Sequence, residues 1–270
     1  MTRPYAEVIG DPIAHSKSPL IHNFWLKKLG IDAEYRACHV SLDGLAAYFA
    51  ARRGDPAWCG CNVTLPHKLA VIDHVADPGN VRATIGAMNT VARAGDGTLF
   101  GTNTDAGGFL GPILDAPLAG ASAVVIGTGG AAHAILFALA QAEIGSVTVL
   151  ARNALKGAAL LAQFGLKGQV KALDAKLPPA LLLVNASALG MTGQPPLAID
   201  LSPLPDDAII YDAVYAPLNT PLLKAARARG LECVDGLEML VGQAALAFEL
   251  FYGAPPPEGD DDELRALLTR

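Results

Sequence analysis

The stretch 121–141, ASAVVIGTGGAAHAILFALAQ, restricts the fold of this chain more than any other part of it. An apolar run leads directly into a group of glycines, and an uncharged helical pattern follows. A strand buried on both faces, a tight glycine turn and a buried helix give this order in parallel α/β sheets. The wider stretch 116–142 has no charge and is long enough to span a membrane, but the glycines in its middle favour strand, turn and helix.

The remainder of the chain alternates strands and helices with short gaps, which predicts an α/β protein with a doubly wound parallel sheet. In the second half we expect strands over 146–152, 181–187 and 208–215, and helices over 154–165, 220–230 and 237–253. In the first half we expect strands over 5–10, 33–40 and 58–64, helices over 18–30, 42–54 and 66–75, and a hairpin over 87–103. Two such units in series indicate two domains, with a boundary near the TNTD segment.

Composition excludes several classes of function. The 270 residues carry a net charge of -6, and no run of basic residues occurs, which argues against nucleic acid or an anionic membrane as a partner. Charged residues near the start interrupt any apolar leader, so we expect a cytoplasmic protein. Among the four cysteines only Cys59 and Cys61 form a close pair, which predicts free thiols and no zinc site.

The glycine turn indicates a dinucleotide site. Gly127, Gly129 and Ala132 match the pattern G-x-G-x-x-A, after a strand and at the start of a helix, where backbone N–H groups can bind a pyrophosphate. After the next strand, NAD enzymes usually carry an acidic residue, but this chain has Arg152 and Lys156, which attract a 2′-phosphate. NADP is therefore preferred. The alternatives are glycines that serve packing alone and an Arg152 that is only a solvated charge.

Polar groups gather in the first half at HSKSP and NVTLPHK. Ser16 and Ser18 precede a helix, and Ser18 is its expected N-cap; the pair serves either capping alone or a carboxylate cradle. Asn62 and Thr64 alternate along a strand and so point to one face.

Lys68 follows at the third position of the helix that Pro66 is expected to begin. The positive end of that helix would lower the pKa of the lysine, which suits proton transfer; an exposed lysine is the alternative. Asp105 is either a plain helix cap or a partner that holds Lys68 in place and opposes this shift.

Eight segments together resemble one family. SKSP, NVTLPHK, AMNT, NTDA, GTGGA, NAS, YDAVY and DGLEMLVGQAA occur in this order across nearly the whole chain. This series is similar to that of the shikimate dehydrogenases, the NADP-linked enzymes that reduce 3-dehydroshikimate to shikimate in chorismate and aromatic amino-acid biosynthesis. Thr102, Ala106 and Ala213 depart from the usual family pattern, and only Ala213 puts a cofactor contact in doubt.

The resemblance implies a role for each matching residue. The catalytic residues would be Lys68 and Asp105, without a metal. The substrate carboxylate would be held by Ser16, Ser18 and Tyr215, and the ring hydroxyls by Asn62, Thr64, Asn89, Asp105 and Gln243. The pyrophosphate would meet Gly127, Thr128, Gly129, Gly130 and Ala131, the 2′-phosphate Arg152, Asn153 and Lys156, and the nicotinamide Ala213 and Gly236. His67 is expected to point away from the substrate.

The same resemblance implies a domain plan. Residues 1–104 would bind substrate and carry the catalytic lysine, residues 105–236 would form a Rossmann-like NADP domain, and residues 237–270 would return to the first domain, with catalysis in the cleft between them. A monomer and a homodimer both fit. The alternatives are a quinate/shikimate dehydrogenase that tolerates NAD, a non-catalytic NADP-binding sensor on the same fold, and the related methylene-tetrahydrofolate dehydrogenase architecture, against which SKSP and VGQAA argue.

Overall fold

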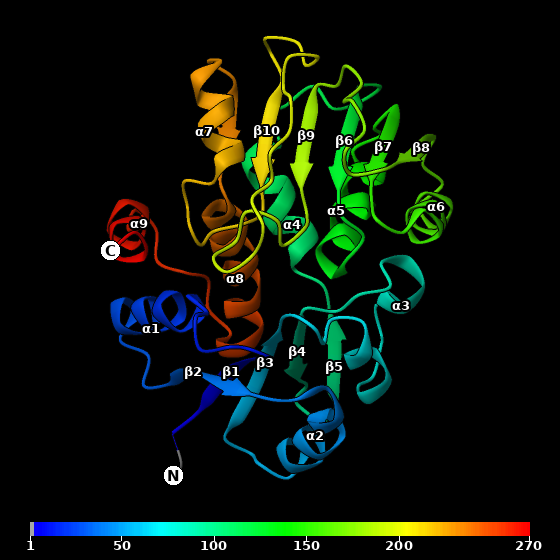
Figure 1. Ribbon diagram of the computed structural model, residues 1–270. Helices are drawn as coiled ribbons and strands as arrows, with labels where there is room; N and C mark the ends of the chain where they lie inside the picture. Colours follow the sequence, from blue (N-terminus) through cyan, green and yellow to red (C-terminus); the bar gives the residue numbers. More distant parts are fainter. Residues whose placement is uncertain (1–2) are drawn as a thin grey trace. The chain divides into compact units, whose positions relative to one another are not determined.

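The computed structural model describes residues 3–270 and contains two compact units, each with its own sheet (Figure 1). Unit 1 comprises Met1–Thr104 and Val241–Arg270, and unit 2 comprises Asp105–Leu240. The predicted α/β class with two sheets is confirmed. No helix among residues 3–270 has the length and apolarity that a membrane span requires.

Unit 2 is built on a six-stranded parallel sheet in the order β11-β10-β9-β6-β7-β8. Its strands are β6 (Ser122–Ile126), β7 (Ser146–Leu150), β8 (Gly168–Lys171), β9 (Leu182–Asn185), β10 (Ile209–Asp212) and β11 (Glu232–Val234). Its helices are α4 (Asp105–Leu110), α5 (Gly130–Gln141), α6 (Ala154–Gln163) and α7 (Pro221–Ala228), with the 3-10 turn η3 (Gly111–Ile113). The chain winds outward in both directions from β6, so the topological switch point lies between β6 and β9.

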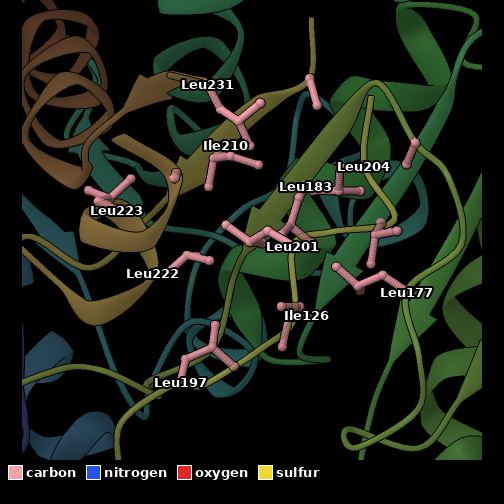
Figure 2. Packing of buried hydrophobic residues seen from close by; sticks show 14 of the residues in the cluster. Ile126, Leu177, Leu183, Leu197, Leu201, Leu204, Ile210, Leu222, Leu223 and Leu231 are labelled. Atoms are coloured by element: carbon pink, nitrogen blue, oxygen red, sulfur yellow. The ribbon is translucent and has the colours of Figure 1, made fainter. Parts of the chain in front are cut away.

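The core of unit 2 explains the apolar strands. Ile126, Leu183 and Ile210 project from one face of the three central strands and pack against residues of α7 and of the long segment before β10, such as Leu222 and Leu201 (Figure 2). The alternate residues of these strands are buried as well, as a sheet covered on both faces requires. The uncharged stretch is thus β6, the glycine turn and α5.

Unit 1 has a five-stranded mixed sheet in the order β2-β1-β3-β4-β5. β1 (Tyr5–Gly10), β2 (Glu34–His39) and β3 (Trp58–Val63) are parallel, while β4 (Thr90–Arg93) and β5 (Leu99–Thr102) form the predicted antiparallel hairpin. Its helices are α1 (Ser18–Leu29), α2 (Leu45–Arg53), α3 (Val81–Thr84) and α9 (Asp261–Leu268), with 3-10 turns η1 (Leu42–Gly44) and η2 (Ala70–His74). The last long helix, α8, spans Gly236–Tyr252 and contributes Ala247 and Phe251 to the core of unit 1.

The predicted helix over 66–75 is wrong. Residues 65–69 form turns, and only the short η2 follows them. The backbone oxygen of Lys68 accepts a hydrogen bond from the N–H of Met88 at 2.8 Å, so it takes part in a tertiary contact rather than in a helical ladder. His67 is fully buried, and its Nε2 lies 2.7 Å from the Val40 oxygen. Lys68 therefore does not lie in the first turn of a helix, contrary to the expectation from the sequence.

The expected cap of α1 is also displaced by one residue. The N-cap position is Lys17, which makes no side-chain cap, and Ser18 is already the first helical residue. The hydroxyl of Ser16 accepts the backbone N–H of Ser18 at 3.3 Å instead. The other end is as predicted, because Gly30 ends the helix in the left-handed conformation with φ 64°.

Candidate active site

A cluster of amides and hydroxyls lies in unit 1 at the carboxyl end of β3. Asn89 occupies its centre and is 1% exposed. Its Nδ2 donates to Thr104 Oγ1 at 2.9 Å and to Gln243 Oε1 at 3.2 Å. Its Oδ1 accepts the backbone N–H of Thr104 at 2.7 Å and the hydroxyl of Thr90 at 3.2 Å. We call Asn62, Asn89, Thr90, Thr104 and Gln243 the amide–hydroxyl cluster; its polar groups are neutral.

Asn62 links the amide–hydroxyl cluster to the aromatic residues beside it. Its Nδ2 donates to Thr90 Oγ1 at 3.0 Å, and its Oδ1 accepts the hydroxyl of Tyr35 at 2.6 Å. The ring of Tyr35 stacks on His22 with 3.9 Å between ring centroids. Both ring nitrogens of His22 are buried without a hydrogen-bond partner among the described residues, and burial lowers the pKa of this histidine to about 3. A neutral aromatic stack thus backs the amide of Asn62.

Lys68 and Asp105 are each tied to this cluster through the backbone. The Lys68 oxygen accepts the N–H of Met88, the residue before Asn89. Asp105 directly follows Thr104, whose N–H donates to Asn89, and the Asp105 side chain is buried at 4% exposure. Lys68 is half-buried in the turn after β3, and Thr64, also half-buried, begins that turn.

The loop before α1 brings the hydroxyls of HSKSP to the same unit. Ser16 is half-buried and Ser18 is 4% exposed at the start of the helix. Lys17, between them, donates from its ammonium to the Leu268 carbonyl at the end of α9. Ser16 therefore lies in the loop and Ser18 at the first position of α1, where the two hydroxyls are compatible with carboxylate binding.

In unit 2 the glycine turn follows β6 and opens α5. Gly127 has φ 110°, a backbone conformation that side chains rarely adopt, and a Cβ on it would lie 3.1 Å from the Ala186 oxygen. A Cβ on Gly129 would meet nothing within 4 Å, so open space lies beside the turn. Thr128 and Ala131 are half-buried, and Gly130 is the buried first residue of α5. Free N–H groups at the start of this helix face a position that an anion can approach closely.

The residues expected to bind a 2′-phosphate follow β7. Arg152, Asn153 and Lys156 are all exposed. Asn153 is the N-cap of α6, because its Oδ1 accepts the backbone N–H of Lys156 at 3.1 Å. Two exposed cations, Arg152 and Lys156, thus flank the start of α6, and none of these three residues is acidic.

The loops after β9 and β10 complete the carboxyl edge of this sheet. Ala213 and Tyr215 are half-buried in the loop after β10, and burial raises the pKa of the Tyr215 hydroxyl. Position 236 requires glycine because its backbone packs closely against the loop: a Cβ there would lie 2.5 Å from the Val214 carbonyl carbon. Beneath the loop, Asn185 and Asp212 are fully buried and hydrogen-bonded to one another at 2.9 Å.

Residues 8–91 match the model of the shikimate dehydrogenase substrate binding domain, and residues 236–260 match that of the shikimate 5'-dehydrogenase C-terminal domain. The shikimate dehydrogenase (NADP(+)) of Sphingopyxis alaskensis is 69% identical over 98% of this chain and 97% of its own length. The chain belongs to the shikimate dehydrogenase family.

Solved structures of similar proteins agree with this membership. The shikimate 5-dehydrogenase of Thermus thermophilus, in complex with NADP(H) and shikimate, superposes with a TM-score of 0.85 at 37% identity, over 98% of this chain and 99% of that one. The ligand-free 5-ketofructose reductase of a Gluconobacter strain gives a TM-score of 0.88 at 30% identity, over 100% of this chain and 98% of that one. The shikimate dehydrogenase fold is therefore shared by at least one protein with a different name and substrate.

Sequence reasoning missed several polar residues of this shikimate dehydrogenase family member. Thr90 and Thr104 bridge the cluster around Asn89, and Asp212 and Thr220 hold the loop after β10. A sequence signal was present, because Thr90 lies in AMNT, Thr104 in NTDA and Asp212 in YDAVY, with Thr220 after it, but most of their partners lie in other segments of the chain. Within residues 3–270 no three histidine, cysteine or acidic side chains gather as a metal site would require.

Proposed function

We propose that this chain catalyses the reversible NADPH-dependent reduction of 3-dehydroshikimate to shikimate. The observation that carries the proposal is the 69% identity to the shikimate dehydrogenase (NADP(+)) of Sphingopyxis alaskensis, over 98% of this chain. The partners in this proposal are shikimate, 3-dehydroshikimate and NADP(H). The reaction belongs to aromatic amino-acid biosynthesis, which we place in the cytoplasm as the sequence predicts.

The amide–hydroxyl cluster supports the substrate half of this proposal. Shikimate carries ring hydroxyls, and each hydroxyl both donates and accepts hydrogen bonds, as do the amides and hydroxyls of Asn89, Gln243 and Thr64. We assign these three residues and Asn62 to the ring hydroxyls; the amide of Asn62 also bonds to Tyr35 and Thr90. The carboxylate is assigned to Ser16, Ser18 and Tyr215.

The turn after β6 fits the cofactor. Open space beside Gly129 and the left-handed backbone of Gly127 allow a pyrophosphate to approach the start of α5. Thr128 lies in this turn and Gly130 and Ala131 begin α5, and we assign all three to the pyrophosphate. Arg152, Asn153 and Lys156 are assigned to the 2′-phosphate. Ala213 and Gly236 are assigned to the nicotinamide side.

When bound, NADPH supplies the hydride that the ring ketone accepts. We assign to Lys68 the proton that the ketone oxygen needs as it becomes a hydroxyl, and in the reverse direction Lys68 is the base. Its ammonium also stabilises negative charge that develops on this oxygen. Asp105 is assigned the task of orienting the amine and a neighbouring substrate hydroxyl.

The direct test is replacement of the amine. Lys68→Ala should lower kcat by ~10²–10⁴-fold, the usual contribution of a positioned acid or base, and change KM little. Lys224→Ala, which removes an exposed amine from α7, is the matched control. If Lys68→Ala retains kcat within about threefold of the wild type, the role assigned to Lys68 is wrong.

Substrate choice is tested with initial rates for shikimate and quinate, each with NADP and with NAD. The proposal expects the highest kcat/KM with shikimate and NADP. Comparable rates with quinate and NAD would favour a quinate/shikimate dehydrogenase, and no turnover of any substrate would favour a cofactor-binding sensor. 5-Ketofructose belongs in the panel because a reductase of that sugar shares the fold.

A further inference from the structure

A buried carboxylate, that of Asp212, lies beneath the loop that carries Ala213 and Tyr215. Asp212 ends β10 and is fully buried. Its Oδ1 accepts the backbone N–H of Val214 at 3.0 Å and Nδ2 of Asn185 at 2.9 Å, and its Oδ2 accepts the hydroxyl of Thr220 at 2.6 Å. All three neighbours donate, and an ionised carboxylate only accepts, so the donors match this group.

Asn185 extends this network to the loop after β9. Its Oδ1 accepts the backbone N–H of Ser187 at 3.1 Å and the Ser187 hydroxyl at 2.7 Å, and its Nδ2 also donates to the Leu189 oxygen at 2.9 Å. The bond between Asn185 and Asp212 therefore couples two loops at the carboxyl ends of neighbouring strands. These strands lie beside the switch point of the sheet, where ligands bind in folds of this kind.

Two further contacts restrict the loop of residues 213–216. The backbone N–H of Ala213 donates to the Asn185 oxygen at 3.0 Å, and the N–H of Thr192 donates to the Ala216 oxygen at 2.8 Å. On another side the backbone of Gly236 approaches so closely that no Cβ fits. The loop is thus confined from several directions, and Asp212 is the one ionisable group in these contacts.

We propose that Asp212 is a positioning residue, which with Asn185 and Thr220 fixes Ala213 and Tyr215 in the conformation that substrate and nicotinamide require, without touching either ligand. This inference rests on the proposed function, because Ala213 and Tyr215 have their roles only there. We assign no proton transfer to Asp212, because its oxygens accept three hydrogen bonds from groups of the protein itself. Burial raises the pKa of the Asp212 carboxyl, and the hydrogen bonds from Thr220, Val214 and Asn185 oppose that rise.

The test replaces Asp212 by its isostere. Asp212→Asn keeps the shape but turns one oxygen into a donor that faces the Thr220 hydroxyl. Thr220→Val breaks only the Oδ2 bond and the cap of α7, and it carries the same prediction if Asp212→Asn does not fold. The matched control is Asp200→Asn, because the exposed Asp200 likewise accepts a hydroxyl and a backbone N–H, both from Ser202.

Four quantities are measured for each protein: kcat and KM with shikimate, the affinity for NADP⁺ alone, and the rate of amide hydrogen exchange of residues 213–216. Asp212→Asn should lower kcat/KM for shikimate about tenfold or more and speed exchange of the loop at least tenfold. NADP⁺ affinity should stay within about twofold, and Asp200→Asn should match the wild type throughout.

Unchanged kinetics and exchange in Asp212→Asn would overturn the inference. It would also fall if exchange rose throughout unit 2 and NADP⁺ affinity dropped in parallel, since Asp212 would then support the whole unit rather than one loop. A wild type that never oxidises shikimate would refute the proposed function instead, and the exchange rates would still decide whether Asp212 fixes the loop.

Discussion

Each of the two sheets carries buried polar groups at the carboxyl ends of its parallel strands, but the groups differ in charge and in hydrogen-bonding capacity. In unit 1 the amide–hydroxyl cluster contains only neutral groups that both donate and accept. In unit 2 the corresponding network is built on the carboxylate of Asp212, which only accepts. Groups that can exchange donor and acceptor roles are able to rearrange around a polyhydroxy acid, whereas a carboxylate surrounded by donors keeps one arrangement.

This difference separates two tasks that a binding site has to perform. The neutral cluster contacts the substrate directly in our proposal, and its internal hydrogen bonds can be replaced by bonds to substrate hydroxyls. In our proposal the network around Asp212 instead holds the backbone of residues 213–216 in one conformation. This difference can be tested by substitutions that place a carboxylate in the neutral cluster and an amide at the position of the carboxylate.

The largest effect is expected from an isosteric charge introduced into the neutral cluster. Asn89→Asp would place a carboxylate oxygen against the Gln243 Oε1 that now accepts from Asn89. A buried charge beside an acceptor oxygen is costly, so the free energy of unfolding at pH 8 should fall by about 3 kcal/mol, and kcat/KM for shikimate by more than about 100-fold. Urea unfolding and initial rates measure both.

The loss of stability in Asn89→Asp should depend on pH. The introduced carboxyl would have a raised pKa in the folded state, so protonation at pH 5.5 should restore part of the lost stability. The reverse exchange, Asp212→Asn, should change stability by no more than about 1 kcal/mol, because it removes a buried charge along with a charged hydrogen bond. A larger loss for Asp212→Asn than for Asn89→Asp would contradict the comparison.

An intermediate effect is expected from charge that faces solvent in unit 2. Arg152→Ala removes the planar cation after β7, which is exposed and free to meet a 2′-phosphate. The kcat/KM for NADP should drop about 30-fold, or ~2 kcal/mol, from the loss of charge-assisted hydrogen bonds. The reaction with NAD is the internal control, since NAD lacks that phosphate; an equal drop with both cofactors would show that Arg152 does not select between them.

The smallest effect concerns the aromatic stack behind Asn62. The unfolded chain protonates His22 below its ordinary pKa of 6.5, whereas burial lowers the pKa in the folded protein to about 3. The contribution of neutral His22 to the free energy of unfolding is therefore complete above pH 6.5. It is lost as the pH falls toward 3, by about 1.4 kcal/mol per pH unit. Between pH 6.5 and 5.5 the wild type should lose about 1 kcal/mol more than His22→Phe, measured by urea unfolding. Parallel curves would mean that His22 is not buried neutral.

Much of the fold could be predicted because long periodic segments dominate it. The strand, glycine turn and helix of residues 121–141 and the hairpin of 87–103 depend on local patterns, and both are confirmed. β8 and β11 were missed because they are short and partly polar, with sequences GQVK and ECV. The helix over 66–75 failed because its pattern is outweighed by tertiary bonds of His67 and Lys68.

The candidate site was predictable as residue types, but not as contacts. Asn89 and Gln243 are recognisable from their motifs, yet their hydrogen bond joins residues 154 positions apart. Glu7 is a stronger case. In the sequence it is only a charge that interrupts an apolar leader, but in the structure it is 1% exposed and accepts hydrogen bonds from Arg52 and Tyr48. No local pattern encodes such partners.

The cap of α6 has a consequence for how cofactor preference can change over generations. Asn153 performs two tasks, since its Oδ1 begins the helix while the residue lies among those assigned to the 2′-phosphate. Aspartate caps a helix as well as asparagine does, and the two amino acids have neighbouring codons. A lineage could thus place a carboxylate beside that phosphate in one mutational step and keep the helix start intact. Selection on NADP, rather than on folding, is what would preserve the amide.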